Sequence, residues 1–199
     1  MGKSILVLAP TEREYRHMLA TIAAKSNLKN SYTVITSRIG KALSAATVSK
    51  VLAEGDGKYE GVAIIGFAAG SACYKQADIV APRVALNHDC HVPDGFIPEL
   101  TDPFELLGDD DATVFTGDSF VDAPMIREIM ERFKCEKAIF DMEIAAVAAA
   151  VKQCYDLPVL AVKMISDCPE HGDTEFSYDI FADSHSDFSP ILERIEQIF

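Results

Sequence analysis

The sequence contains few basic residues for its length. Its 18 lysines and arginines are outnumbered by 31 aspartates and glutamates, which gives a formal net charge of −13 at pH 7. A surface of this charge repels the phosphate backbone of nucleic acids and anionic membrane surfaces. We therefore expect neither nucleic acid nor a membrane as a partner, and we expect a small-molecule ligand.

Long apolar runs are also absent. No stretch approaches the roughly 20 apolar residues that span a bilayer. Lys3 is followed only by the run Ile5–Ala9, which is too short for the core of a signal peptide. The five cysteines are scattered without a Cys-x-x-Cys pair, which argues against a disulfide framework and a structural zinc site. Together these absences predict a cytoplasmic protein with reduced cysteines.

The sequence lacks the loops that usually bind nucleotide phosphates. No Gly-Lys-Ser/Thr segment is present, and Gly66–Gly70 does not match the dinucleotide pattern Gly-x-Gly-x-x-Gly. His88, Asp89 and His91 are close together in the chain, but no second cluster of metal-ligating residues accompanies them. We therefore expect no cofactor and no metal site.

What is present is a regular alternation of short apolar segments and amphipathic ones. The apolar segments predict strands at Ser4–Ala9, Ser31–Arg38, Val62–Phe67, Asp78–Asn87, Ala112–Thr116, Ala138–Phe140 and Pro158–Ile165. The amphipathic segments predict helices at Thr11–Ala24, Gly40–Glu54, Ala123–Phe133, Met142–Tyr155 and Pro190–Phe199. This alternation predicts an α/β fold, a single domain over residues 1–199 with a central, mixed but mostly parallel twisted sheet flanked by helices on both faces. The segment His91–Asp111 is predicted to be the longest loop.

Acidic residues lie where two of the predicted strands end. In open α/β sheets, ligands bind beyond the carboxyl ends of the strands. Glu14 follows the first strand, either as the partner of Thr11 in a capping box or as a base that activates water. Asp167 follows the last strand, either as a turn cap or as a reacting acid. These residue types and spacings leave both choices open.

Two further residues suggest a ligand site. Glu143 lies within the mostly apolar run Ile139–Val151. It either favours a helix N-terminus or binds sugar hydroxyls, because burying a carboxylate without partners is costly. Phe120, within Gly117–Val121, follows another predicted strand. Its ring is either half-buried in a turn or stacked on a flat base.

Taken together and in this order, these segments resemble the nucleoside phosphorylase/hydrolase superfamily, and most closely its 5′-methylthioadenosine/S-adenosylhomocysteine nucleosidases. The resemblance covers most of the chain. The matched motifs are the acidic cluster at Leu8–Glu14, the Gly-Ile-Gly-Lys turn at Arg38–Lys41, the Thr-Gly-Ser-Ala-Gly turn at Ile65–Gly70, the Gly-Asp-x-Phe motif at Gly117–Val121, the Glu-Met-Glu-x-x-Ala helix start at Asp141–Ala146 and the Arg-x-Ile-Ser-Asp strand ending at Val162–Asp167. The resemblance implies a nucleosidase that hydrolyses the N-glycosidic bond of a methylthioadenosine-like purine nucleoside.

The resemblance implies roles for the residues that act on the base and on the attacking water. Asp167 would protonate the purine at N7, so that the base leaves more easily. An aspartic acid that holds a proton near neutral pH needs a pKa that burial raises. Phe120 would stack on the base, and the backbone of Val121 would read the edge of the base. Glu14 would orient or deprotonate the attacking water.

The resemblance also implies roles on the sugar side. Glu143 would hold the ribose hydroxyls and stabilise the positive charge that the sugar develops in the transition state. Met142 would pack beneath the sugar, and Arg38 and Ala69, within the matched turns, would also contact the substrate. The family commonly forms dimers or hexamers, so we expect a homodimer or a higher homo-oligomer.

Three of the departures from the family pattern in the matched turns fall on the sugar and nucleophile side of the site. Arg38 and Phe67 stand where the family has glycine, and Ala68 stands where it has serine. Arg38 could bind phosphate, as in a nucleoside phosphorylase, or a substrate carboxylate, as in futalosine hydrolase. Water is the preferred nucleophile, because Glu14 would repel phosphate and Ala63–Ile65 is apolar where the phosphorylases carry a second arginine. A non-catalytic nucleoside-binding protein is the alternative of a different class, since Phe67 and Ala68 alter the sugar side.

Overall fold

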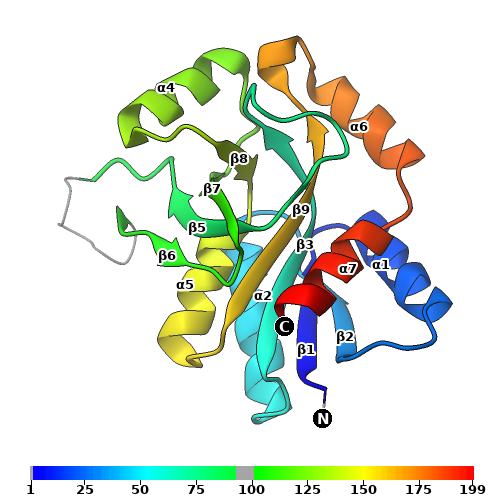
Figure 1. Ribbon diagram of the computed structural model, residues 1–199. Coiled ribbons are helices and arrows are strands. Elements are labelled where there is room, and N and C mark those ends of the chain that lie inside the picture. Colours follow the sequence, from blue (N-terminus) through cyan, green and yellow to red (C-terminus); the bar gives the residue numbers. More distant parts are fainter. Residues whose placement is uncertain (1, 93–100) are drawn as a thin grey trace.

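The computed structural model describes residues 2–92 and 101–199 (Figure 1). Its strands are β1 (Ser4–Ala9), β2 (Ser31–Thr36), β3 (Gly61–Gly70), β4 (Ile79–Val80), β5 (Pro82–Asn87), β6 (Phe104–Glu105), β7 (Asp110–Thr116), β8 (Ala138–Asp141) and β9 (Val159–Asp167). Its helices are α1 (Glu12–Ala24), α2 (Lys41–Gly55), α4 (Ala123–Phe133), α5 (Ile144–Cys154), α6 (Glu175–Ser184) and α7 (Ser189–Ile198), with a 3-10 turn at Pro169–His171. Within these described ranges, no helix has both the length and the apolar character needed to cross a bilayer.

The strands form one mixed sheet in which parallel pairs predominate. β1 pairs with β2 and β3, β3 with β9, β5 with β7 and β7 with β8, all in parallel. The antiparallel pairs are β3 with β8, β4 with β9 and β5 with β6. From β3, one path of paired strands runs through β9 to β4, and another runs through β8 and β7 to β5. Only Ala81 separates β4 from β5 in the chain, so the two paths join and close a ring. The predicted mixed, mostly parallel sheet is thus confirmed, and its ends curl toward each other.

Apolar clusters cover the two faces of the sheet. One cluster joins the strands to α2 and α5, and the other joins them to α1, α6 and α7. Along β9, Ala161 and Ile165 belong to the first cluster, whereas Val162 and Met164 belong to the second, as the period-two alternation of a strand requires. Figure 1 shows α5 and α1 on opposite sides of the sheet, so the predicted helices on both faces are confirmed.

Several element boundaries differ from those that the sequence predicts. The strand predicted at residues 78–87 is interrupted at Ala81, because its first part pairs with β9 and its second part with β7. The predicted loop at residues 91–111 contains β6, and its residues 93–100 lie outside the described residues. The helix α6 has no counterpart among the predicted elements. The last long strand continues two residues beyond its predicted end, so Asp167 closes β9 itself instead of capping a turn.

Candidate functional site

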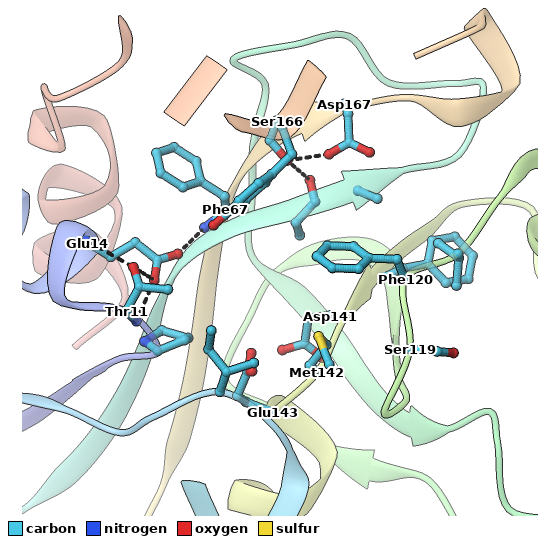
Figure 2. Close-up of a pocket in the computed structure, with 17 residues that line it drawn as sticks. Thr11, Glu14, Phe67, Ser119, Phe120, Asp141, Met142, Glu143, Ser166 and Asp167 are labelled. Atoms are coloured by element: carbon cyan, nitrogen blue, oxygen red, sulfur yellow. Dashed lines mark hydrogen bonds between the residues drawn. The ribbon is translucent and has the colours of Figure 1, made fainter. Parts of the chain in front are cut away.

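A cavity of about 140 Å³ lies at the carboxyl ends of β1, β3, β8 and β9. This edge is where ligands bind in sheets of this type. Seven of the eight predicted site residues line the cavity: Glu14, Ala69, Phe120, Val121, Met142, Glu143 and Asp167 (Figure 2). Glu14 and Asp167 are 153 positions apart in the chain. They are brought to one site because β1, which leads into α1, and β9 end at the same edge of the sheet.

The charged residues that line the cavity are all acidic. They are Glu14, Asp141, Glu143 and Asp167, and the described lining includes no lysine, arginine or histidine. In the view of Figure 2, Glu14 lies at the left of the cavity, Asp167 at the upper right and Glu143 at the bottom. A cavity with this lining favours a neutral or cationic ligand and disfavours an anion.

Glu14 is fixed by hydrogen bonds from three donors. The backbone N–H and the hydroxyl of Thr11 donate to its Oε2 at 2.8 and 2.7 Å, and the backbone N–H of Phe67 donates to its Oε1 at 2.9 Å. The backbone N–H of Glu14 in turn donates to the Thr11 hydroxyl at 3.2 Å. The capping box predicted from the spacing is thus confirmed. The bond from Phe67 shows that Glu14 also links α1 to the end of β3.

The approach of Glu14 to β3 requires a glycine at position 66. Gly66 has a φ of +130°, and a Cβ atom there would lie 2.2 Å from Glu14 Oε1. Residues with a side chain rarely adopt this backbone conformation, and glycine adopts it readily. Gly66 therefore allows β3 to present the Phe67 N–H to the carboxylate.

Glu143 lies at the start of α5 and is almost fully buried. The backbone N–H of Gly40 donates to its Oε1 at 3.0 Å. Burial raises the pKa of Glu143 to about 7; the negative charge of Asp141 also raises it, whereas Lys163 and the Gly40 hydrogen bond lower it. Glu143 stands at the N-cap position of α5, but its side chain makes no cap hydrogen bond. Asp141 Oδ2 accepts from the backbone N–H of Ile144 at 3.0 Å instead. Glu143 therefore lies at the helix N-terminus, and its carboxylate also lines the cavity.

Asp167 is positioned by an irregularity in the sheet. The register between β3 and β9 shifts at Ala68/Ala69, so that Ala69 pairs with Asp167. Such bulges change the direction of a side chain and often lie beside functional sites. The Ser166 hydroxyl lies 2.5 Å from Asp167 Oδ1. Burial raises the pKa of Asp167, against the opposing effect of the Ser166 hydrogen bond.

The aromatic side of the cavity is formed by loops and by one helix that the sequence patterns did not reveal. Phe120 is 65% exposed at the rim, and its ring centroid lies 6.4 Å from that of Tyr178 on α6. Tyr178 also makes an edge contact with Phe67. At the start of α6 the Thr174 N–H donates to the Ser177 hydroxyl at 3.0 Å. Ser177 stands where a capping box has Glu or Gln, so the sequence carries no strong signal for this helix.

Arg38 is the predicted site residue that does not line the cavity. Its side chain is exposed, its φ is +71°, and its neighbour Ile39 lines the cavity in its place. The nearby His88-Asp89 segment serves a structural contact, since Asp89 pairs with Lys41 at 2.6 Å. The described ranges contain no cluster of three or more His, Cys, Asp or Glu side chains arranged to hold a metal ion.

The chain is similar to known proteins in structure but not detectably in sequence. No protein-family model matches the sequence, and no curated protein matches it. The S-adenosylhomocysteine nucleosidase of Streptococcus pyogenes, in complex with 5-methylthiotubericidin, has a TM-score of 0.80 at 20% identity, over 98% of this chain and 96% of its own. The 5′-methylthioadenosine/S-adenosylhomocysteine nucleosidase of Colwellia psychrerythraea 34H, in complex with adenine, has a TM-score of 0.80 at 19% identity, over 100% and 96%.

A third structure is an aspartate-to-asparagine variant of the Helicobacter pylori nucleosidase with 5′-methylthioadenosine in the active site. It has a TM-score of 0.80 at 22% identity, over 99% of each chain. The chain therefore has the fold of the 5′-methylthioadenosine/S-adenosylhomocysteine nucleosidases.

The contact between Gly66 and Glu14 predicts a selective effect of adding one methyl group. We expect Gly66→Ala to lower the free energy of unfolding by roughly 2–4 kcal/mol, because it combines backbone strain with displacement of Glu14. Gly57→Ala is the matched control, since Gly57 also has a positive φ, +77°, but has no atom within 4 Å of an added Cβ. It should lower that free energy by about 1 kcal/mol. Equal losses in urea denaturation would contradict the close contact.

The raised pKa of Glu143 predicts how stability depends on pH. Because the pKa of the folded state lies above the ordinary value of 4.5, the folded protein binds the Glu143 proton more tightly, and stability falls as pH rises from about 4.5 to about 7. Glu143→Gln removes this contribution and keeps an acceptor for Gly40. We therefore compare the free energy of unfolding of the variant with that of the unmodified protein at each pH. The difference, variant minus unmodified protein, should be more positive at pH 8 than at pH 5.

Urea denaturation at the two pH values measures that difference. Glu128→Gln removes an exposed carboxylate of α4 that does not line the cavity and serves as the control. If the stability difference between Glu143→Gln and the unmodified protein does not change with pH, as expected for the control, burial does not disfavour the ionised form of Glu143.

Proposed function

We propose that this protein is a nucleosidase that hydrolyses the N-glycosidic bond of a purine nucleoside, with water as the nucleophile. The observation that carries the proposal is the set of three carboxyl groups, Glu14, Glu143 and Asp167, that line one cavity with no cationic side chain among them. The likeness in fold to nucleosidases supports the same reaction class.

Glycosidic cleavage places opposite demands on the two sides of the cavity. The sugar becomes positively charged in the transition state, and fixed negative charge stabilises it. The departing base becomes negatively charged unless it receives a proton. Glu143 and Glu14 can meet the first demand, and Asp167 can meet the second because burial favours its protonated form. Figure 2 is consistent with this division, since Asp167 lies across the cavity from Glu14.

The hydrogen bonds of Glu14 suit it to hold a water molecule. A carboxylate has about four acceptor sites. Glu14 accepts hydrogen bonds from three donors, two at Oε2 and one at Oε1. An acceptor site therefore remains at Oε1 for a proton of the attacking water. The three bonds also fix the carboxylate in place, so that little reorganisation is needed when the water reacts.

The placement of Arg38 weighs against the two alternatives that need a cation. A phosphorylase must hold phosphate, and futalosine hydrolase must accept an acidic substituent, so both need positive groups beside the ligand. Arg38 is exposed and lies outside the lining. The lining instead presents Ile39, Phe67 and Met142, which favours an uncharged 5′ group such as that of methylthioadenosine. The cytoplasmic location and the homo-oligomeric state remain predictions from the sequence.

The proposal predicts which substrates release a free base. We expect release of adenine from methylthioadenosine in phosphate-free buffer, at a rate that added phosphate does not increase, and little release from futalosine. Chromatography of the products, with inosine and adenosylhomocysteine as further substrates, measures this. Release that requires phosphate would identify a phosphorylase. Thermal protection by methylthioadenosine without any base release would identify a binding protein.

The role of Asp167 predicts a dependence on the leaving group. Asp167→Asn should lower kcat on methylthioadenosine by on the order of 100-fold or more, since general acids contribute about that much. It should lower the rate far less on 4-nitrophenyl riboside, whose leaving group is stable without a proton. Asp111→Asn, an exposed aspartate outside the lining, is the control. Equal losses on both substrates would contradict the acid role.

A further inference from the structure

We propose that Lys163 is a positioning residue for Glu143, and that its buried ammonium group balances the carboxylates beneath the cavity so that Glu143 can face the sugar as an anion. This inference rests on the proposed function, because it assigns the charge of Glu143 a purpose in the reaction. Lys163 does not line the cavity. It would therefore act through Asp141 and Glu143 and not by touching the substrate.

The position of Lys163 in the sheet is unusual for a lysine. It lies in the middle of β9, in register with Gly66 of β3 on one side and with Val80 of β4 on the other. It shares a face of the strand with Ala161 and Ile165, which belong to the apolar cluster that includes α2 and α5. Its exposed fraction is 0%. Lysine is almost never fully buried without a partner.

Asp141 compensates the charge of Lys163 without accepting a hydrogen bond from it. Its Nζ lies 3.6 Å from Asp141 Oδ2, which is too long for a hydrogen bond. Among the described residues, Nζ has no hydrogen-bond partner. Asp141 does not need the lysine to hold it in place, because its oxygens already accept from the Thr116 hydroxyl at 2.6 Å and the Ile144 N–H at 3.0 Å.

Burial of such a pair does little for folding. Replacing a buried ion pair with apolar groups is often neutral or stabilising, because desolvation offsets the attraction. An ammonium group with no hydrogen bond is a particularly poor source of stability. The fold alone therefore gives no reason for a lysine at position 163, and the charge itself is the feature that requires an explanation.

The charge explains how three carboxyl groups can coexist around the sugar side. The negative charges of Asp141 and Glu14 raise the pKa of Glu143 beyond the effect of burial. Tyr178 of α6 also interacts with Glu143, but it carries no positive charge that could lower this pKa. Lys163 and the Gly40 N–H act in the opposite direction. Lys163 is the cationic side chain in this set. Its removal would leave Glu143 protonated over a wider pH range, and a neutral Glu143 stabilises a cationic sugar poorly.

The test compares the pH dependence of activity in four forms of the full chain. We expect the acidic limb of the kcat/KM profile on methylthioadenosine to move up by about one pH unit in Lys163→Met, because one opposite charge is lost. Lys163→Arg, which keeps the charge, should restore the limb. The double variant Lys163→Met with Asp141→Asn should move it back toward the original position, because the opposing charge is lost as well.

A structural role would give a different result. If Lys163→Met lowers stability but leaves the acidic limb unchanged, the proposal is overturned. If that variant fails to fold, the double variant is tested in its place, because it removes both charges of the pair. Its acidic limb should stay close to that of the unmodified protein. An acidic limb more than one pH unit higher would contradict charge balance between Lys163 and Asp141.

A second readout separates this inference from the proposed function. The stability difference between Glu143→Gln and its parent, measured by urea denaturation across pH 4 to 9, needs no substrate. The pH range over which this difference changes should move to higher pH when both proteins also carry Lys163→Met. A shifted window in a protein that turns over no nucleoside would support the role of Lys163 and reject the nucleosidase. An unshifted window would reject the role of Lys163, whatever the activity.

Discussion

The burial of carboxyl groups around one cavity is the constraint on which the rest of the site depends. Carboxylates are expensive to remove from water, and here four of them line a cavity without a cation in its described lining. Each is compensated by a different set of neighbouring groups. Glu14 receives three hydrogen bonds, Asp141 pairs with Lys163, Glu143 receives the Gly40 N–H, and Asp167 contacts the Ser166 hydroxyl.

These devices determine what each carboxyl group can do. A group held by several donors, such as Glu14, is fixed in place and can hold the attacking water at its remaining acceptor site. A buried group with one short contact, such as Asp167, is suited to hold a proton and give it to a leaving base. Burial and the negative charge of Asp141 raise the pKa of Glu143 to about 7. The chemical difference between three similar side chains therefore comes from the backbone and the neighbours that surround them.

Much of this arrangement follows from the sequence, because local rules govern it. The spacing from Thr11 to Glu14 predicts the capping box, and the order of apolar segments predicts a mostly parallel sheet with helices on both faces. The convergence of Glu14, Glu143 and Asp167 follows once all three are placed at strand ends or the helix that follows one.

The features that the sequence could not supply depend on long-range geometry. The bulge beside Ala69 arises from the pairing of β3 with two partners, and the ring closure from the break at Ala81. The exposed position of Arg38 depends on the path of the turn after β2, and Tyr178 reaches the cavity from α6. The burial of Lys163 beside Asp141 needs both strands in register before it can be recognised.

The central claim is that this acidic cavity stabilises a positively charged sugar. It is tested most directly by the relative affinity for two nucleoside analogues, measured by isothermal titration calorimetry near pH 7.5. Methylthio-immucillin-A carries a cationic sugar mimic, and its matched control is the 9-deazaadenine C-nucleoside that has the same base and 5′-methylthio group on an ordinary neutral ribose. We predict that the cationic analogue binds at least about 100-fold more tightly, because a site built for the transition state prefers its charge. Equal affinity for the two analogues would contradict the claim.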